Sequence, residues 1–269
     1  MDEVEVAGLR IAYERAGHGP PLVLVHGFVG DARGTWGRQL EALSEDFTVV
    51  AWDGPGTGRS ADPPDRFRLP EFADCLAGFV ATLGLRHPHV AGLSFGGAMA
   101  LELYRRHPAV PRTLILASAY AGWAGSLSPE AVADRLRFSL DVAELPPDDF
   151  VESMLPGMFS SSAAPEPVAV AVAAFAATVR EFHPVGFRAM ALASAEADLR
   201  PVLGLVSVPT LVLCGDRDTR APLLVAEALH AAIPGSQLVV LEGVGHVSPV
   251  EAPERFNAAI RRFLGGAGP

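Results

Sequence analysis

The clearest chemical signal in the sequence is a serine set among glycines. Residues 92–97 read GLSFGG, after a strand-like stretch and before a helix-like one. In that context the pattern predicts a nucleophile elbow, because small flanking residues let strand and helix approach each other around a sharp turn. Ser94 would then lie at the N-terminus of the following helix, where backbone N–H groups can stabilise the oxyanion that develops on a substrate carbonyl. A glycine-rich turn that only packs a helix is the alternative interpretation.

A serine hydroxyl becomes a good nucleophile only with a general base and an acid that orients the base. Two later segments supply candidates, each directly after a strand-like run. They are CGDRD, which contains Asp216 and Asp218, and GVGH, which ends in His246. The chain order Ser, Asp, His is the one expected for a serine on this kind of elbow. The order and spacing leave both aspartates open as the acid.

The elements that must position these residues show a regular alternation. An alternating stretch around Gly8, at residues 4–14, predicts an N-terminal hairpin. Continuous apolar runs typical of strands buried on both faces lie at residues 21–25, 47–52, 89–92, 113–117, 210–214 and 238–241. Helical spacing is found at residues 72–80, 98–104, 225–232 and 256–264. The alternation predicts an α/β fold, with a mostly parallel central sheet covered by helices on both faces.

One stretch interrupts the alternation. Residues 121–205 contain helical periodicity and several prolines but no strand-like run. We expect a helical cap inserted after the sixth strand, with residues 1–120 and 206–269 forming the core domain. The cap is rich in Met and Phe, which are either ordinary core or the lining of a substrate pocket beside the carboxyl ends of the strands. The residues expected to line that pocket are Trp123, Phe138, Met154, Met158, Phe182 and Val247.

Composition excludes several classes of chemistry and partner. All 21 basic residues are arginine, so no Schiff base, Ser-Lys dyad or phosphate-binding lysine is available. The net charge of −10 argues against nucleic acid and anionic membranes as partners. The N-terminus lacks the pattern of a signal peptide, and no apolar run reaches membrane-spanning length, so a cytoplasmic location is expected. The two cysteines form no disulfide framework, and the HPH run at residues 87–89 is too short for a metal site.

Taken together, the motifs resemble the α/β-hydrolase superfamily over nearly every core element. They are HGF at residues 26–28, DGPGTGRS at 53–60, the elbow at Ser94, GDRD at 215–218 and GH at 245–246. The resemblance implies that Asp218 rather than Asp216 is the acid. It also implies an oxyanion hole made by the backbone N–H groups of Phe28 and Phe95, with His26 and Asp53 bracing loops. The serine distinguishes the chain from the dehalogenase and epoxide-hydrolase branches, which carry a carboxylate at the elbow.

The expected activity is hydrolysis of a carboxylic ester or lactone through an acyl-enzyme. An apolar acyl group is expected, and N-acyl-homoserine lactones and enol-lactones are candidate substrates. We expect no cofactor and no metal, a small-molecule substrate as the partner, and a monomer or homodimer. Alternatives on the same triad are carbon–carbon bond hydrolysis, cofactor-free perhydrolysis or haloperoxidation, and acyl transfer; a ligand receptor without turnover is a further one. The cap arginines that could hold a second carbonyl or carboxylate, unless they simply face solvent, are Arg135, Arg137, Arg180 and Arg188.

Overall fold

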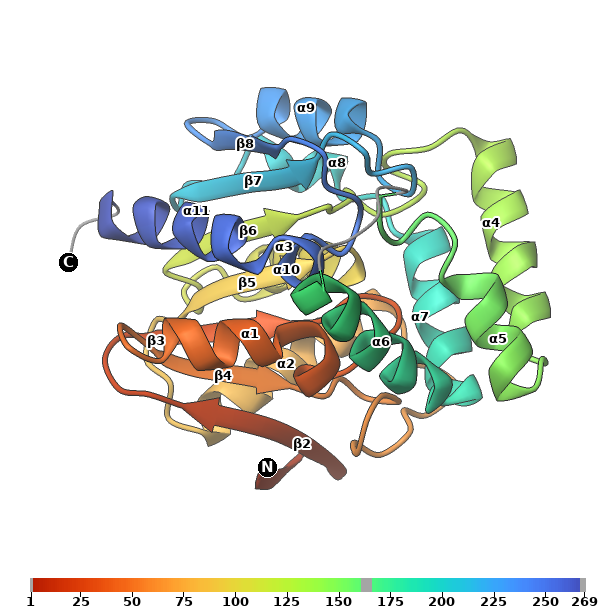
Figure 1. Cartoon of the computed structure of the whole chain (residues 1–269). Coiled ribbons are helices and arrows are strands. Elements are labelled where there is room, and N and C mark those ends of the chain that lie inside the picture. Colours follow the sequence, from red (N-terminus) through yellow and green to blue (C-terminus); the bar gives the residue numbers. More distant parts are fainter. Residues whose placement is uncertain (1, 161–165, 267–269) are drawn as a thin grey trace.

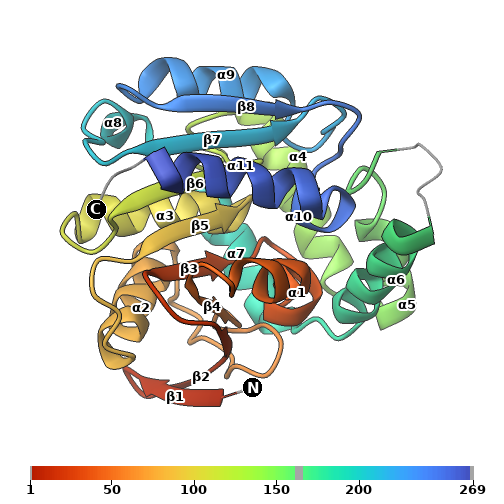
Figure 2. The ribbon, with the colours of Figure 1, turned by 60° about the vertical axis from the view of Figure 1, so that its left-hand side comes forward.

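The structure, a computed structural model, describes residues 2–160 and 166–266. Within those residues eight strands form one sheet, in the order β1-β2-β4-β3-β5-β6-β7-β8 (Figures 1 and 2). Strand β2 is antiparallel to both of its neighbours, and the remaining neighbours pair in parallel. The strands are β1 (Asp2–Val6), β2 (Leu9–Ala16), β3 (Pro21–Val25), β4 (Thr48–Trp52), β5 (His89–Leu93), β6 (Thr113–Ala117), β7 (Thr210–Gly215) and β8 (Gln237–Leu241).

Helices cover both faces of this sheet. One face is packed by α1 (Ala32–Leu43), α10 (Ser248–Glu251) and α11 (Pro253–Gly266), and the other by α2 (Leu69–Thr82), α3 (Phe95–Arg106), α8 (Arg200–Leu203) and α9 (Leu223–Ala232). Strands β3 to β7 contribute alternate residues to the two cores: in β3, Leu22 and Leu24 belong to the first core, and Val23 and Val25 to the second. A strand buried on both faces needs apolar residues at every position, which explains its continuous apolar run.

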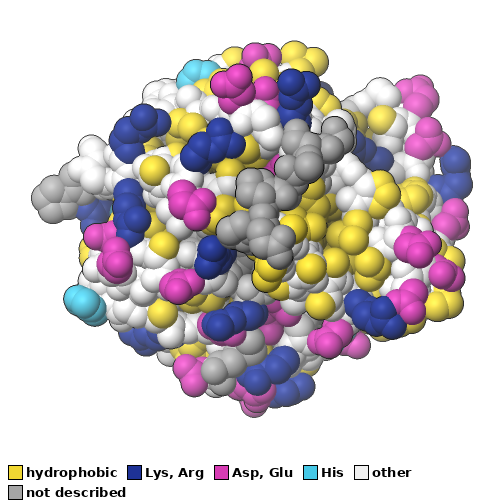
Figure 3. Space-filling view, in the orientation of Figure 1, with side chains coloured by type: hydrophobic (Ala, Val, Ile, Leu, Met, Phe, Trp, Pro, Cys, Tyr) yellow, Lys and Arg dark blue, Asp and Glu magenta, His cyan; other side chains and the backbone are white. Residues whose placement is uncertain are grey.

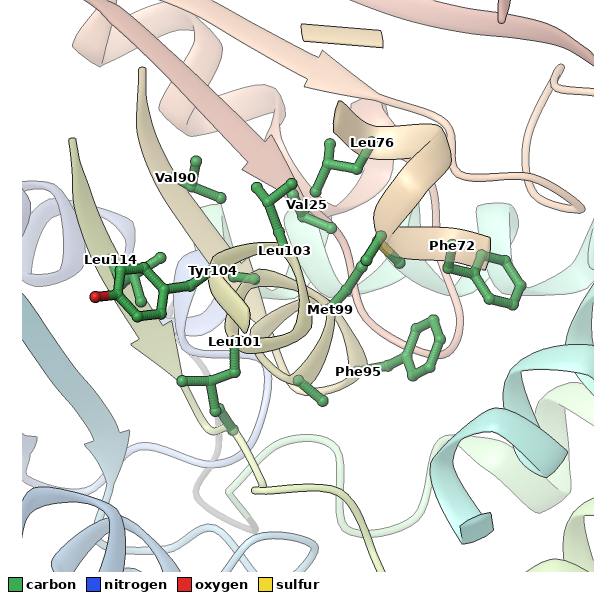
Figure 4. Close-up of a cluster of buried hydrophobic side chains, with 14 of the residues drawn as sticks. Val25, Phe72, Leu76, Val90, Phe95, Met99, Leu101, Leu103, Tyr104 and Leu114 are labelled. Carbon is green, nitrogen blue, oxygen red and sulfur yellow. The ribbon is translucent and has the colours of Figure 1, made fainter. Parts of the chain in front are cut away.

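Helix α3 is the element that holds the elbow. Its buried side chains pack among those of β3, β5, β6 and α2 (Figure 4). The residues labelled there are Val25, Phe72, Leu76, Val90, Phe95, Met99, Leu101, Leu103, Tyr104 and Leu114. Because the helix is packed on several sides, its first turn is held at the carboxyl end of β5, where Ser94 lies.

Four helices between β6 and β7 lie together beyond the carboxyl ends of the parallel strands (Figure 1). They are α4 (Pro129–Val142), α5 (Pro147–Met154), α6 (Glu166–Arg180) and α7 (Pro184–Glu196), which we call the helical insertion. Three of them begin at a proline, whose fixed φ and missing N–H suit the first helical position. On the face shown in Figure 3, hydrophobic side chains gather near the middle of the view beside this insertion, and charges of both signs are spread over the rest of the face, including the right-hand edge.

The predicted α/β fold with a mostly parallel sheet is confirmed, and β3 to β8 agree with the six predicted apolar runs to within a residue at each end. The hairpin predicted at residues 4–14 is formed by β1 and β2, which extend two residues further at each end. Helix α1 is an addition that the apolar pattern did not indicate. It contains Gly34, Thr35 and Gln39, so only part of its buried face is apolar. No single helix in the described part of the chain is long and apolar enough to cross a membrane. Val168–Arg180 and Pro184–Glu196 meet the length and composition only as a pair bent by 100°.

Candidate active site

Ser94 occupies a strained backbone position between β5 and α3. Its φ of 54° and ψ of −113° lie outside the regions that side-chain-bearing residues favour. The neighbouring glycines make this turn possible. A Cβ on Gly92 would lie 2.1 Å from the carbonyl oxygen of Gly96, and one on Gly96 would lie 2.3 Å from that of Val25. The GLSFGG run is therefore a turn in which strand and helix backbones touch, as the nucleophile elbow requires.

His246 and Asp218 form a buried pair at the ends of β8 and β7. The Nδ1 atom of His246 lies 2.8 Å from Oδ2 of Asp218. The other carboxylate oxygen of Asp218 accepts the backbone N–H groups of Arg220 at 2.9 Å and of Ala221 at 2.7 Å. With Asp218 as its acceptor, Nδ1 carries the proton of a neutral ring, and Nε2 is left to accept one. His246 and Ser94 line the same cavity.

The structure separates the two aspartate candidates. Asp216 is exposed, and its carboxylate accepts the backbone N–H of Gly243 at 2.6 Å. Asp218 is buried and contacts the imidazole of His246. The geometry therefore gives Asp218 the position of the orienting acid, and Asp216 that of a brace for the loop after β8.

The two residues expected to form the oxyanion hole, Phe28 and Phe95, both line the cavity that contains Ser94. Phe95 is the first residue of α3, where an N–H has no acceptor within the helix. Phe28 lies in the loop after β3. That loop approaches the elbow closely, because a Cβ on Gly27 would lie 3.5 Å from Cβ of Ser94. An oxyanion hole formed by these two residues stays a prediction.

His26 and Asp53 brace the loops around this site. The Nδ1 atom of His26 donates to the carbonyl of Gly27 at 2.8 Å, and its Nε2 accepts the N–H of Gly54 at 2.9 Å. Burial lowers the pKa of His26, which keeps Nε2 free of a proton so that it can accept this bond. The carboxylate of Asp53 accepts the N–H groups of Ala32 and Arg59.

The cavity beside Ser94 has a volume of about 60 Å³. Three of the six expected pocket residues, Trp123, Met158 and Val247, line it. The other three lie elsewhere. Phe138 is 46% exposed, Met154 is buried in the core, and Phe182 stacks on Phe150 with ring centroids 3.5 Å apart. Met and Phe at helical spacing show that a helix packs, but not which of its residues face a cavity.

The cavity also has walls that the sequence did not single out as pocket residues. They include Tyr120, Phe175 and Arg220. Tyr120 lies just after β6 and Arg220 two residues after Asp218, so position at a strand end was an available signal for both. Phe175 lies within α6, where the sequence carries no comparable signal.

Of the four cap arginines, one reaches the cavity. Arg135 lines it. Arg137, Arg180 and Arg188 instead form ion pairs with Asp134, Asp148 and Glu144 at the surface.

The two cysteines and His89, which could also carry chemistry, are buried in the fold. Burial raises the pKa of the Cys75 and Cys214 thiols to about 12, so neither is a thiolate nucleophile at neutral pH. His89, from the HPH run, is buried and contacts the hydroxyl of Thr113. In residues 2–160 and 166–266 there is no group of three or more His, Cys, Asp or Glu side chains that could hold a metal ion.

Comparison with known proteins agrees with this architecture. Residues 20–253 match the family model of the alpha/beta hydrolase fold. This match covers most of the chain and agrees with the eight-stranded sheet and the serine turn. The chain belongs to the α/β hydrolases.

Individual relatives resemble the chain over nearly its whole length. A thermophilic esterase from Thermogutta terrifontis, solved with malate bound, is 34% identical, with a TM-score of 0.90 and coverage of 99% of both chains. The enol-lactonase from Burkholderia xenovorans LB400 is 25% identical, with a TM-score of 0.88 over 98% of this chain and 100% of its own. A putative carbamate hydrolase, RutD, from Cronobacter turicensis is 30% identical over 93% of this chain and 92% of its own.

Proposed function

We propose that the chain hydrolyses carboxylic esters or lactones through an acyl-enzyme formed on Ser94. The observation that carries the proposal is the buried His246–Asp218 pair, which shares a small cavity with a serine on a strained elbow. Asp218 orients the imidazole so that Nε2 can act as a general base. Asp216, exposed and turned to another loop, has no part in the chemistry.

In general terms, without naming a substrate, the chain is a hydrolase of ester-type bonds. Its relatives include an esterase, an enol-lactonase and a putative carbamate hydrolase, and each acts on or is named for a carbonyl bonded to an oxygen or nitrogen leaving group. These names support a choice of ester or lactone for this chain over the carbon–carbon, peroxide and acyl-transfer alternatives.

The proposed reaction has two halves. The oxygen of Ser94 attacks the carbonyl carbon while His246 takes the serine proton, and the oxyanion forms against the N–H groups of Phe28 and Phe95. The imidazolium then protonates the departing alkoxide, which leaves the acyl group on Ser94. Water, deprotonated by His246, attacks the acyl carbon and releases the acid with Ser94 restored. Each oxyanion donor contributes roughly 2.7–4 kcal/mol to lowering the barrier.

The walls of the cavity support a short acyl group. Trp123, Met158, Phe175 and Val247 give it apolar sides, and its volume of about 60 Å³ is small. We therefore propose acetyl- to butyryl-sized esters, or small lactones, ahead of long acyl chains.

The proposal is tested with purified protein on nitrophenyl acetate, butyrate and octanoate and on γ-butyrolactone. We expect turnover that is fastest for the short esters and lost by at least about 1000-fold in Ser94→Ala. Ser44→Ala, at the surface end of α1, is the matched control and should keep full activity. If no substrate of this set is cleaved, or if Ser94→Ala retains turnover, the proposal is wrong.

A further inference from the structure

The guanidinium of Arg135 lines the cavity beside Ser94 and has no carboxylate partner among the described side chains. Its Nη1 donates to the hydroxyl of Tyr120 at 2.9 Å and its Nη2 to the backbone oxygen of Arg220 at 2.8 Å. The guanidinium carbon lies 5.4 Å from the Tyr120 ring centroid and 5.9 Å from that of Trp123. Among the described side chains no Asp or Glu forms an ion pair with Arg135, although the guanidinium is half-buried.

A second arginine adds positive charge to the same wall. The guanidinium of Arg220 donates to the backbone oxygens of Met154 and Pro156, so it is held by neutral carbonyls and not by a carboxylate. Burial lowers the pKa of Arg220 and Arg135 lowers it further, as expected for two cations placed close together.

The acidic group nearest to these arginines is already engaged. One oxygen of Asp218 accepts a hydrogen bond from Nδ1 of His246, and the other accepts the backbone N–H groups of Arg220 and Ala221. The hydroxyl of Tyr120 donates to the backbone oxygen of Arg220, and burial raises the pKa of that phenol, so Tyr120 stays neutral. The two guanidinium groups therefore place positive charge at the lining of the cavity.

Two partly buried arginines without a carboxylate partner are unfavourable in free energy unless an anion binds beside them. A cation withdrawn from water loses hydration, and a paired anion is the usual compensation. Most other arginines of this acidic chain do form ion pairs at the surface. A guanidinium carries five N–H donors, and the two bonds of Arg135 leave three. That number and its planar geometry suit a carboxylate bound by two N–H groups.

Resting on the proposed ester or lactone hydrolysis, we propose that the substrate carries a free carboxylate, and that Arg135 binds it while Ser94 attacks the scissile carbonyl. Tyr120 holds the guanidinium toward the cavity, and Arg220 adds positive charge beside it. The small cavity limits the spacer between carboxylate and scissile carbonyl to a few carbon atoms. Arg135 is thus a residue that determines specificity for short monoesters of dicarboxylic acids and for lactones bearing a carboxylate.

The test compares substrates that differ only in charge. Monoethyl succinate and monoethyl glutarate are paired with ethyl succinamate and ethyl glutaramate, in which a neutral amide replaces the carboxylate, and hydrolysis is followed by pH-stat. We expect the wild type to prefer the carboxylate by at least about 10-fold in kcat/KM. Arg135→Gln should lower kcat/KM for the carboxylate by about 10- to 100-fold, mainly through KM, and change the amide by less than about 3-fold.

Two further variants complete the experiment. Arg137→Gln removes a charge from the same helix at an exposed position, where Arg137 pairs with Asp134, and should behave as wild type on all four substrates. Arg135→Lys keeps the charge without the planar fork and should fall between wild type and Arg135→Gln.

Two results would overturn the inference. The wild type could cleave the amides at least as well as the carboxylates. Arg135→Gln could lower both substrates equally, which would make Arg135 a strut between α4 and Tyr120. If Arg135→Gln does not fold, the wild-type ratio and Arg135→Lys decide in the same way. Failure of the wild type on these four esters and on the nitrophenyl esters and lactone alike would instead contradict the proposed hydrolysis, so the two claims are separable.

Discussion

At the scale of single residues, Asp216 and Asp218 show how surroundings decide a role. The two carboxylates are two residues apart, yet one is exposed and accepts a loop N–H while the other is buried against His246. The same Asp→Asn substitution at both positions therefore distinguishes an aspartate that orients His246 from one that only stabilises a loop.

We predict that Asp218→Asn lowers kcat on a short ester by about 10,000-fold. An amide at this position can no longer enforce the imidazole tautomer that leaves Nε2 as the base. Asp216→Asn is the matched control and should keep kcat within a few-fold, with only a small loss of stability. Esterase assays and melting curves of both variants check this. Near-wild-type turnover in Asp218→Asn would assign the acid to another residue.

Residue types and chain order were enough to single out Ser94 and His246 as candidates, because this chemistry tolerates few substitutes. The choice of Asp218 over Asp216 needed the family resemblance as well. The remaining pocket could not be predicted in the same way. Arg135 and Arg137 are two residues apart on α4, and only Arg135 lines the cavity. The side of a helix that meets a cavity depends on how the helix packs, and the local sequence does not encode that packing uniquely.

At the scale of elements, Glu251 at the end of α10 joins the His246 loop to the helical insertion. One of its oxygens accepts the N–H of Gly245 at 2.8 Å, and the other accepts the N–H of Ser160 at 3.0 Å and the Ser160 hydroxyl. The N–H of Val247 also donates to the carbonyl of Met158 at 3.0 Å. The residues on both sides of His246 are therefore anchored to the segment after α5.

We predict that Glu251→Gln lowers kcat by about 10- to 100-fold, because one amide nitrogen then faces an N–H donor and the His246 loop loses part of its support. The unfolding free energy should fall by roughly 1.5–3 kcal/mol, as expected for a lost hydrogen bond to a charged group. Glu254→Gln makes the same change at an exposed position and should alter neither value. Wild-type kcat in Glu251→Gln would show that the contact does not position His246.

The elements differ in how far the sequence predicts them. Strands such as β3 and β6 are buried on both faces, so nearly every position is apolar and the run is easy to recognise. Helix α1 buries polar side chains as well: Gln39 donates to the backbone oxygen of Pro249 and to the side chain of Asn257. A polar residue whose partners lie more than 200 positions away gives no local apolar signal.

At the scale of the whole molecule, charge is distributed unevenly between surface and site. The chain carries a net charge of −10 with arginine as its only basic residue besides histidine, yet Arg135 and Arg220 line the cavity. A negative exterior with a positive wall inside the site favours an anionic substrate only through short-range contacts, because salt screens charges beyond about 10 Å.

Buried histidines make the stability of the whole fold depend on pH. Burial lowers the pKa of His89 to about 4, with the charge of Arg112 adding to the effect. Between pH 6.5 and 4 the unfolded chain binds a proton at this position and the folded chain does not. Stability is therefore fully present above pH 6.5 and is lost as the pH falls toward 4.

We predict that His89→Gln weakens this pH dependence. The free energy of unfolding of the wild type should fall more steeply between pH 6.5 and 4, by up to about 1.4 kcal/mol per pH unit for the one proton. Urea unfolding at several pH values in this window measures both slopes, and a comparison at pH 8 gives the cost of the substitution itself. Equal slopes would mean that His89 takes up no extra proton on unfolding.

The proposed function depends on Ser94 acting as the nucleophile and on His246 activating it. The most direct measurement is the reaction of the protein with a serine-directed fluorophosphonate, followed by mass spectrometry of the intact chain and of its peptides. We predict one phosphonyl adduct, on the peptide that contains Ser94, formed in step with the loss of esterase activity and absent in Ser94→Ala. An adduct at another residue, or full activity with Ser94 modified, would contradict the account.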